Sequence, residues 1–296
     1  MMHPTATASA QAHPSGFPVV ACPPAWRTAA ALLRIVARGS LLVTAGLFVF
    51  SDFPPANPFR QMRIFFGFVA LPELAAWCIA RAFAARIRAE GGGLVVDGRD
   101  VRVEIPATAI AAVEPWVLPL PGAGIQVRLH SGRSFSYGIR LSDADDLVRD
   151  VVAEGADPAV GEGLRSRIAA YARGLAGIAP SRFDHPLFKF LVYAIVPTVP
   201  AYRLHQIITY GGFLGEYYTF GLKAWLLGFG LWWVSWAFSL MLVAAVMRVA
   251  GEALAMLLVA AAPGRAGAER RWIERILRVL YFAGIPLFLL VRLLDW

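Results

Sequence analysis

The most unusual ionisable residue in the sequence is Glu73, which follows Pro72 near the middle of a long apolar segment at residues 64–85. An ionised carboxylate is costly at that depth in a bilayer, so it normally faces a charged partner or a water-filled cavity. Two roles are open: a proton or ion site of a transporter, or a structural acid that is paired with an arginine of a neighbouring helix or is neutral by protonation. The expected partners are Arg203 and His205, which lie near one end of a later apolar segment, and Arg203 is the preferred one.

A second charged pair, Arg248 and Glu252, also lies in apolar surroundings. Residues four apart share one face of a helix, which predicts an intrahelical ion pair at a membrane interface. The five histidines show no metal-ligand spacing, and no Cys-x-x-Cys, His-Glu-x-x-His or lysine-containing phosphate loop occurs. We therefore expect no catalytic residues, no cofactor and no metal.

The composition indicates a membrane protein. Hydrophobic residues make up 58% of the chain, charged residues only 16%, and the mean hydropathy is +0.58. Soluble domains carry about a quarter charged residues. The net charge of +8 is unevenly distributed, because residues 90–182 carry −2 and the remainder +10. A nucleic-acid-binding protein would carry its basic excess on the exposed region, so we exclude that class.

The elements that must position these residues are long apolar segments. A membrane-spanning helix needs about 20 apolar residues, and about five segments meet that need. They cover residues 28–50, 64–85, 187–210, 222–246 and 276–294. No turn separates Arg248 from the apolar residues that precede Pro263, so we expect one long helix that extends past the membrane or bends along its surface.

Arginine and lysine in the short flanks predict the orientation, because the more basic side of an inner-membrane protein is cytoplasmic. The basic flanks lie at residues 27–38, 81–88 and 265–278, and Lys189 is on the same side. We therefore expect a multi-pass protein of the bacterial inner membrane with a cytoplasmic N-terminus and a periplasmic C-terminus at Trp296.

Between the two groups of apolar segments lies a region that reads as a soluble domain. Alternating apolar residues predict strands at 94–96, 101–105, 110–117, 125–130 and 134–139, followed by a helix that Gly155 ends. The expected fold is an α-helical polytopic membrane protein with an inserted α+β cytoplasmic domain, an antiparallel sheet plus a C-terminal helix. The expected divisions are a disordered cytoplasmic tail (1–26), two membrane helices (27–88), the sheet domain (89–156), an amphipathic helix or linker (157–184) and three membrane helices (185–296).

This order of elements resembles the bacterial pleckstrin-homology-like domains found beside membrane helices in envelope proteins. The resemblance covers about 60 residues and is carried by residues 93–98, 105–113 and 127–133 and by the Asp-rich start of the helix. It implies a docking role rather than a reaction. A full barrel of this type has seven strands, so two strands are either absent or lie near residues 85–92. The hairpin at residues 97–100 is charge-balanced, so the resemblance does not imply binding of a phosphoinositide headgroup.

Three functions follow in order of preference. The first is a non-enzymatic membrane protein whose sheet domain docks a protein partner or a second copy of itself, with the lipid bilayer as its other partner and no nucleic acid. The second is a transporter, or a subunit of one, that uses Glu73. The third is a membrane enzyme acting on lipids. The amphipathic segment at 157–184 either lies on the inner leaflet or packs against the sheet domain.

Overall fold

The computed structural model describes residues 16–50, 58–99, 101–117, 122–141, 143–178 and 181–294. The chain divides into two compact units. The first contains Met1–Leu32 and Ala75–Ala176, and the second contains Leu33–Leu74 and Gly177–Trp296. Of the expected disordered tail, residues 1–15 lie outside the described residues, as does the C-terminal Trp296.

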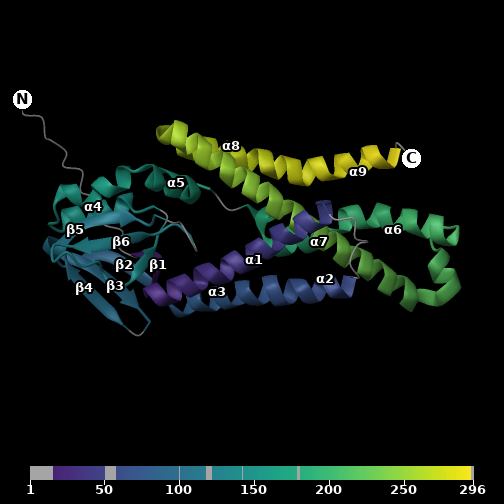
Figure 1. Ribbon diagram of the computed structural model, residues 1–296, viewed down its shortest axis with the longest axis horizontal. Coiled ribbons are helices and arrows are strands. Elements are labelled where there is room, and N and C mark those ends of the chain that lie inside the picture. The colour runs from purple at the N-terminus through teal and green to yellow at the C-terminus, as the bar shows by residue number, and fades with distance from the viewer. Residues whose placement is uncertain are drawn as a thin grey trace, which may run out of the picture. The chain divides into compact units, whose positions relative to one another are not determined.

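The first unit is built on a seven-stranded antiparallel sheet in the order β4-β3-β2-β1-β7-β6-β5 (Figure 1). The strands are β1 (Phe17–Cys22), β2 (Ala84–Glu90), β3 (Gly93–Gly98), β4 (Arg102–Pro106), β5 (Ile110–Pro115), β6 (Ile125–Leu129) and β7 (Gly138–Arg140). The glycine pair Gly91-Gly92 joins β2 to β3, and both residues have positive φ, +64° and +78°. A tight hairpin turn needs that backbone conformation, which residues with a Cβ rarely adopt.

Two of the seven strands are not among the five that the sequence predicts. Strand β1 falls in the expected disordered tail, so that prediction is wrong for Phe17–Cys22. Strand β2 begins at Ala84, inside the segment expected to be the second membrane helix, so the sheet domain starts before the expected residue 89. Local sequence could not indicate β1, because its backbone pairs with β2 and β7, which are both far away in the sequence.

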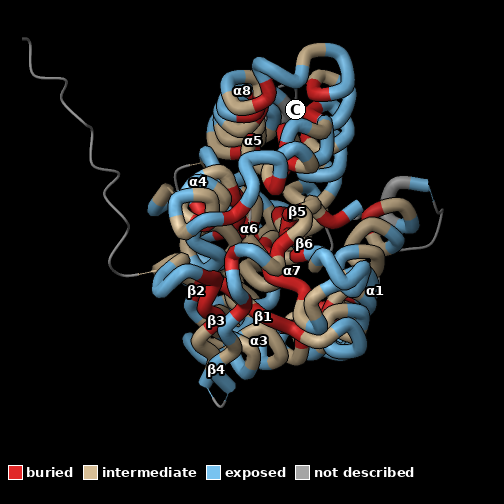
Figure 2. Tube along the Cα trace, turned by 90° about the vertical axis from the view of Figure 1, so that its left-hand side faces the viewer, coloured by how far each residue is buried: buried red, intermediate tan, exposed pale blue. Residues whose placement is uncertain are grey.

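The core of the sheet follows from strand alternation. Ile87, Val127 and Ile139 are fully buried, whereas Arg86 and Arg88 on the same strand as Ile87 remain partly accessible. Figure 2 shows the buried segments as red stretches along the strands. Helix α4 (Asp145–Ala153) adds Leu147 and Val151 to this core.

The segment after α4 also belongs to the sheet domain. The 3₁₀ segment η3 (Pro158–Arg165) contributes Val160 and Leu164 to the core, and helix α5 (Arg167–Ala176) contributes Ala169. A side chain at Gly163 would lie 2.9 Å from the Val113 carbonyl oxygen, so η3 approaches the backbone of β5 closely. The sequence left two alternatives for this segment, a position on the inner leaflet or packing against the sheet domain, and in the structure it packs against the sheet.

Helices make up the rest of the described chain. They are α1 (Pro24–Phe50), α2 (Pro58–Phe65), α3 (Leu71–Ala82), α6 (Ile195–Tyr210), α7 (Gly215–Ala261), α8 (Ala266–Val279) and α9 (Ile285–Leu294). π-Helical turns η1 (Phe66–Ala70), η5 (Leu187–Val192) and η7 (Leu280–Gly284) lie between or before them, and short 3₁₀ turns η2 (Ala107–Ala109), η4 (Arg182–Asp184) and η6 (Pro263–Arg265) complete the elements.

Four helical segments are long and apolar enough to cross a membrane, which indicates a multi-pass membrane protein. They are Pro24–Leu47, Phe59–Ala82, Leu187–Tyr210 and Gly215–Ala261. The second of them ends at Ala82 rather than at residue 85, because the following alanines belong to β2. The expected fifth span, at residues 276–294, is not among these four and stays a prediction.

The expected long helix after the fourth span is present. Helix α7 is broken only at Gly221, where φ is +83°, and then continues to Ala261. Those 40 residues rise about 60 Å, twice the roughly 30 Å of a bilayer's hydrocarbon core. Helix α8 runs back alongside the C-terminal half of α7 (Figure 1).

Candidate functional site

The five residues singled out in the sequence fall into three separate clusters of the second unit. Glu73 forms the first with two arginines of α1. Arg248 and Glu252 belong to the second, between α7 and α8, and Arg203 and His205 lie in the third, on α6. The structure therefore does not bring all five together in one site.

Glu73, in the first turn of α3, has two partners. Arg38 Nε lies 3.5 Å from one carboxylate oxygen and Arg34 Nε 3.8 Å from the other. The expected first partner was wrong: the Arg203 guanidinium instead lies 5.0 Å from the centre of the Phe213 ring. Arg34 and Arg38 are four residues apart, so one face of α1 carries both.

Equal depth explains this pairing. Arg34 lies ten residues after Pro24, where the first span begins, and Glu73 lies nine residues before Ala82, where the second ends. In an antiparallel helical hairpin these positions are level with each other. The carboxylate can neutralise one of the two positive charges inside the apolar region and leaves the group with a net charge of +1, which is a structural role.

The second cluster joins α7 to α8 through four charges. Arg248 lies 2.8 Å from Glu252, the intrahelical pair that the spacing predicts, and also 2.7 Å from Glu274 of α8. Arg270 is only 3% exposed and donates to both carboxylate oxygens of Glu252. Gly251 permits the close approach, since a Cβ there would lie 2.6 Å from Leu277. The network of two arginines and two glutamates is neutral overall and holds α7 against α8; we call it the charge clamp.

Next to the third cluster lies a polar group on α6 and α7 that sequence reasoning missed. The hydroxyl of Tyr202 and the amide of Gln206 each donate to the same carboxylate oxygen of Glu216, at 2.8 Å, and the backbone N–H of Glu216 donates to Gln206 at 3.0 Å. Gln206 is fully buried and Tyr202 nearly so. The available signal was the i, i+4 spacing of Tyr202 and Gln206, but Glu216 lies past a glycine-rich turn and gave none.

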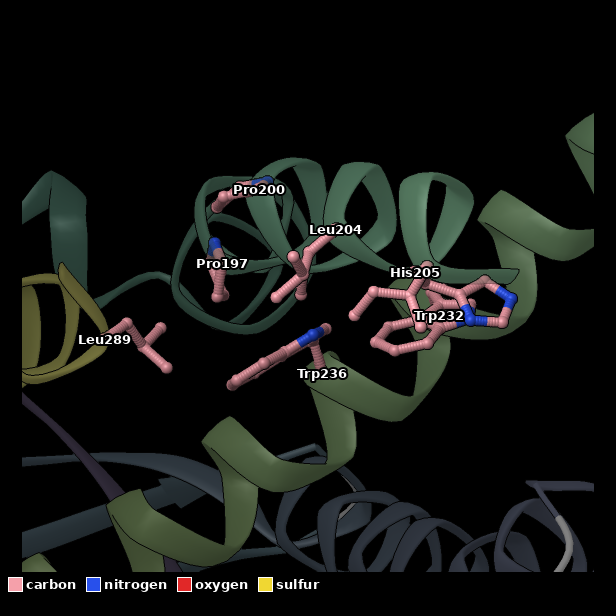
Figure 3. A pocket seen from close by; sticks show the side chains of 9 residues that line it. Pro197, Pro200, Leu204, His205, Trp232, Trp236 and Leu289 are labelled. Atoms are coloured by element: carbon pink, nitrogen blue, oxygen red, sulfur yellow. The ribbon is translucent and has the colours of Figure 1, made fainter. Parts of the chain in front are cut away.

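His205 lies beside that group, with its ring 6.2 Å from the Tyr202 ring, and it lines an apolar cavity of about 270 Å³ (Figure 3). Its ring lies 5.1 Å from that of Trp232, and Nδ1 lies 3.1 Å from the Thr209 hydroxyl. Two prolines and one leucine of α6 and two tryptophans of α7 form most of the remaining wall: Pro197, Pro200, Leu204, Trp232 and Trp236.

The first unit contains a different feature, the joint where its sheet meets the membrane helices. Strand β1 leads into α1 at Pro24, and α3 leads into β2 at Ala84. Across the joint, the backbone N–H of Ala21 donates to the Phe83 carbonyl at 3.0 Å. Trp26 lies 6.0 Å from the Phe83 ring.

Cys22 is buried at this joint. Its burial raises the pKa of the thiol to about 11, although the nearby Arg27 guanidinium acts in the opposite direction. The thiol is therefore protonated at neutral pH and a poor nucleophile.

Comparisons with family models, with curated proteins and with solved structures found no match. Among the residues that the structure describes, no three His, Cys, Asp or Glu side chains gather as metal ligands would. What the geometry offers is thus a set of ion pairs, a buried polar group, an apolar cavity and a sheet domain joined to two membrane helices.

Proposed function

We propose that this chain is a non-enzymatic multi-pass protein of the bacterial inner membrane. In this proposal its sheet domain is a pleckstrin-homology-like module that faces the cytoplasm and docks a protein partner. The seven strands followed by a helix support the module, because this is the strand number of a full barrel of that type. The two strands that the sequence pattern lacked are β1 and β2.

The observation that carries the proposal is the position of the membrane hairpin within the sheet. Strands β1 and β2 are neighbours, paired from Phe17 with Ile87 to Val20 with Ala84, yet the first two spans lie between them in the chain. Two adjacent strands therefore tether the domain to the bilayer. A binding module held in this way raises the local concentration of its partner at the membrane, which suits docking.

The edge strand β4 is the surface best suited to receive the partner. The opposite edge, β5, is approached by η3 near Gly163. On β4 the side chains of Arg102, Glu104 and Pro106 are exposed. An edge strand offers unpaired backbone groups to an extended peptide, and the side chains beside it select the sequence. We propose that the partner adds a strand there.

Site-specific photocrosslinking in intact cells tests this proposal. A benzoylphenylalanine at position 104 should give one discrete crosslinked band whose partner peptide is identified by mass spectrometry. The matched control is position 149, where Arg149 is exposed on α4. A band at twice the mass of the chain would identify a second copy as the partner. Equal crosslinking at both positions, or none at 104, would contradict docking on β4.

The transporter alternative has less support, because Glu73 is paired with Arg34 and Arg38. The substitution Glu73→Gln discriminates between the two functions. It should leave crosslinking at position 104 intact if the protein is a docking module, and it should abolish function if Glu73 carries a proton or an ion.

A further inference from the structure

The lining of the apolar cavity beside His205 extends along α6 for about the thickness of one leaflet's hydrocarbon region. This lining runs from Pro197 to Ile208, twelve residues that rise about 16 Å from the first to the last. One leaflet contributes about 15 Å of hydrocarbon. The candidate span Leu187–Tyr210 ends two residues beyond Ile208, so the cavity extends from mid-span towards the end of the span at Tyr210.

The two ends of the cavity differ in chemistry. Figure 3 shows Leu289 of α9 beyond Pro197 at one end, and His205 with Trp232 at the other. The Leu289 end is apolar. The His205 end carries an imidazole that contacts the Thr209 hydroxyl, one residue from the end of the span. Hydrogen-bonding groups therefore lie where the polar part of a lipid would be, and apolar groups lie at mid-span.

The walls suit a thin, flexible occupant. Ala201 has a short side chain, and Pro200 lies inside α6, where its ring prevents the normal hydrogen bond to the preceding turn. Opposite them, Trp232 and Trp236 are four residues apart on one face of α7 (Figure 3). We propose that this cavity binds one acyl chain of a single phospholipid, with the chain end near Leu289 and the ester groups near His205.

Native mass spectrometry of the full-length protein tests the proposal. The purified protein is stripped of lipid with detergent and reloaded with palmitoyl-oleoyl phosphatidylethanolamine. Ala201→Phe fills the cavity, and Val199→Phe, at an exposed position of α6 outside the lining, is its matched control. Wild type and Val199→Phe should each retain one lipid at a detergent concentration that removes the others, whereas occupancy of Ala201→Phe should fall at least about tenfold.

Three results would overturn the proposal: no lipid retained by wild type, equal retention by Ala201→Phe, or a detergent adduct that lipid does not displace. Should Ala201→Phe fail to fold, phospholipid brominated in mid-chain provides a second test with well-folded protein. Its bromines should quench the fluorescence of wild type more than that of a variant carrying Trp232→Phe and Trp236→Phe. Equal quenching of the two proteins would contradict binding in this cavity.

Discussion

The guanidinium of Arg27 lies 4.8 Å from the centre of the Trp116 ring. Arg27 is in the first turn of α1, and Trp116 directly follows β5. The indole is buried, and a Cβ at Gly124 or Gly138 would lie within 3 Å of it. The first turn of a membrane helix is thereby held against the residue that follows the edge strand β5, in addition to its covalent connection to the central strand β1.

A double-mutant cycle measures this contact. Arg27→Ala and Trp116→Phe should each lower the thermal stability of the purified protein, and the two effects should not add. We expect a coupling energy of about 1 kcal/mol, typical of a partly desolvated cation–π pair. Full additivity of the two losses would show that the ring and the guanidinium do not interact.

Replacing Glu73 should destabilise the membrane helices. Glu73→Ala leaves Arg34 and Arg38 without their carboxylate; because the side chains of Glu73 and Arg38 are 40% and 64% exposed, we expect a loss below the roughly 3 kcal/mol of a fully buried pair. Adding Arg34→Leu should then restore part of the lost stability, measured as the melting temperature in detergent. Arg203→Leu is the matched control, and recovery with Arg203→Leu instead would contradict the observed pairing.

The charge clamp between α7 and α8 depends most on Arg270. Arg270→Met leaves Glu252 and Glu274 facing each other with only Arg248 between them. Because the guanidinium is buried, we expect a loss of about 3 kcal/mol. Arg271→Met, at the exposed neighbouring position, should change stability by less than about 0.5 kcal/mol in the same denaturation assay. Equal effects of the two substitutions would refute the clamp.

Cys22 should react slowly with alkylating reagents in the folded protein. Its pKa is raised from 9.0 to about 11, so at pH 8 the thiolate fraction falls about a hundredfold, and the slower reaction is measured with iodoacetamide in a Cys78→Ser background. Between pH 9 and 11 the unfolded chain loses the thiol proton first, so this group lowers stability as the pH rises through that window and has no such effect below it. Equal alkylation rates in native and denatured protein would disprove the burial.

Local patterns predicted the elements whose partners are close in sequence. The hairpins β3–β4 and β5–β6 and the helix α4 were visible as alternation and periodicity. Strand β1 was not, because its six mostly apolar residues pair with β2 and β7, which are far away in the sequence. Strand β2 was indicated only as one of two alternatives, a missing strand near residues 85–92. The same limit applies to Glu73. Its residue type indicated that it needs a partner, but identifying Arg34 required a comparison of how far each residue lies from the end of its membrane span.

The most direct test of the central claim, that the sheet domain is assembled around the membrane hairpin, compares two soluble fragments. One joins residues 16–22 to 84–176 through a short Gly-Ser linker in place of the hairpin, which the pairing of Val20 with Ala84 permits. The other contains residues 89–155 and lacks β1, β2 and η3. We expect the joined fragment to give a β-rich circular-dichroism spectrum and a cooperative melt, and the shorter one to remain unfolded. A shorter fragment that folds and melts at the same temperature as the joined one would contradict the account.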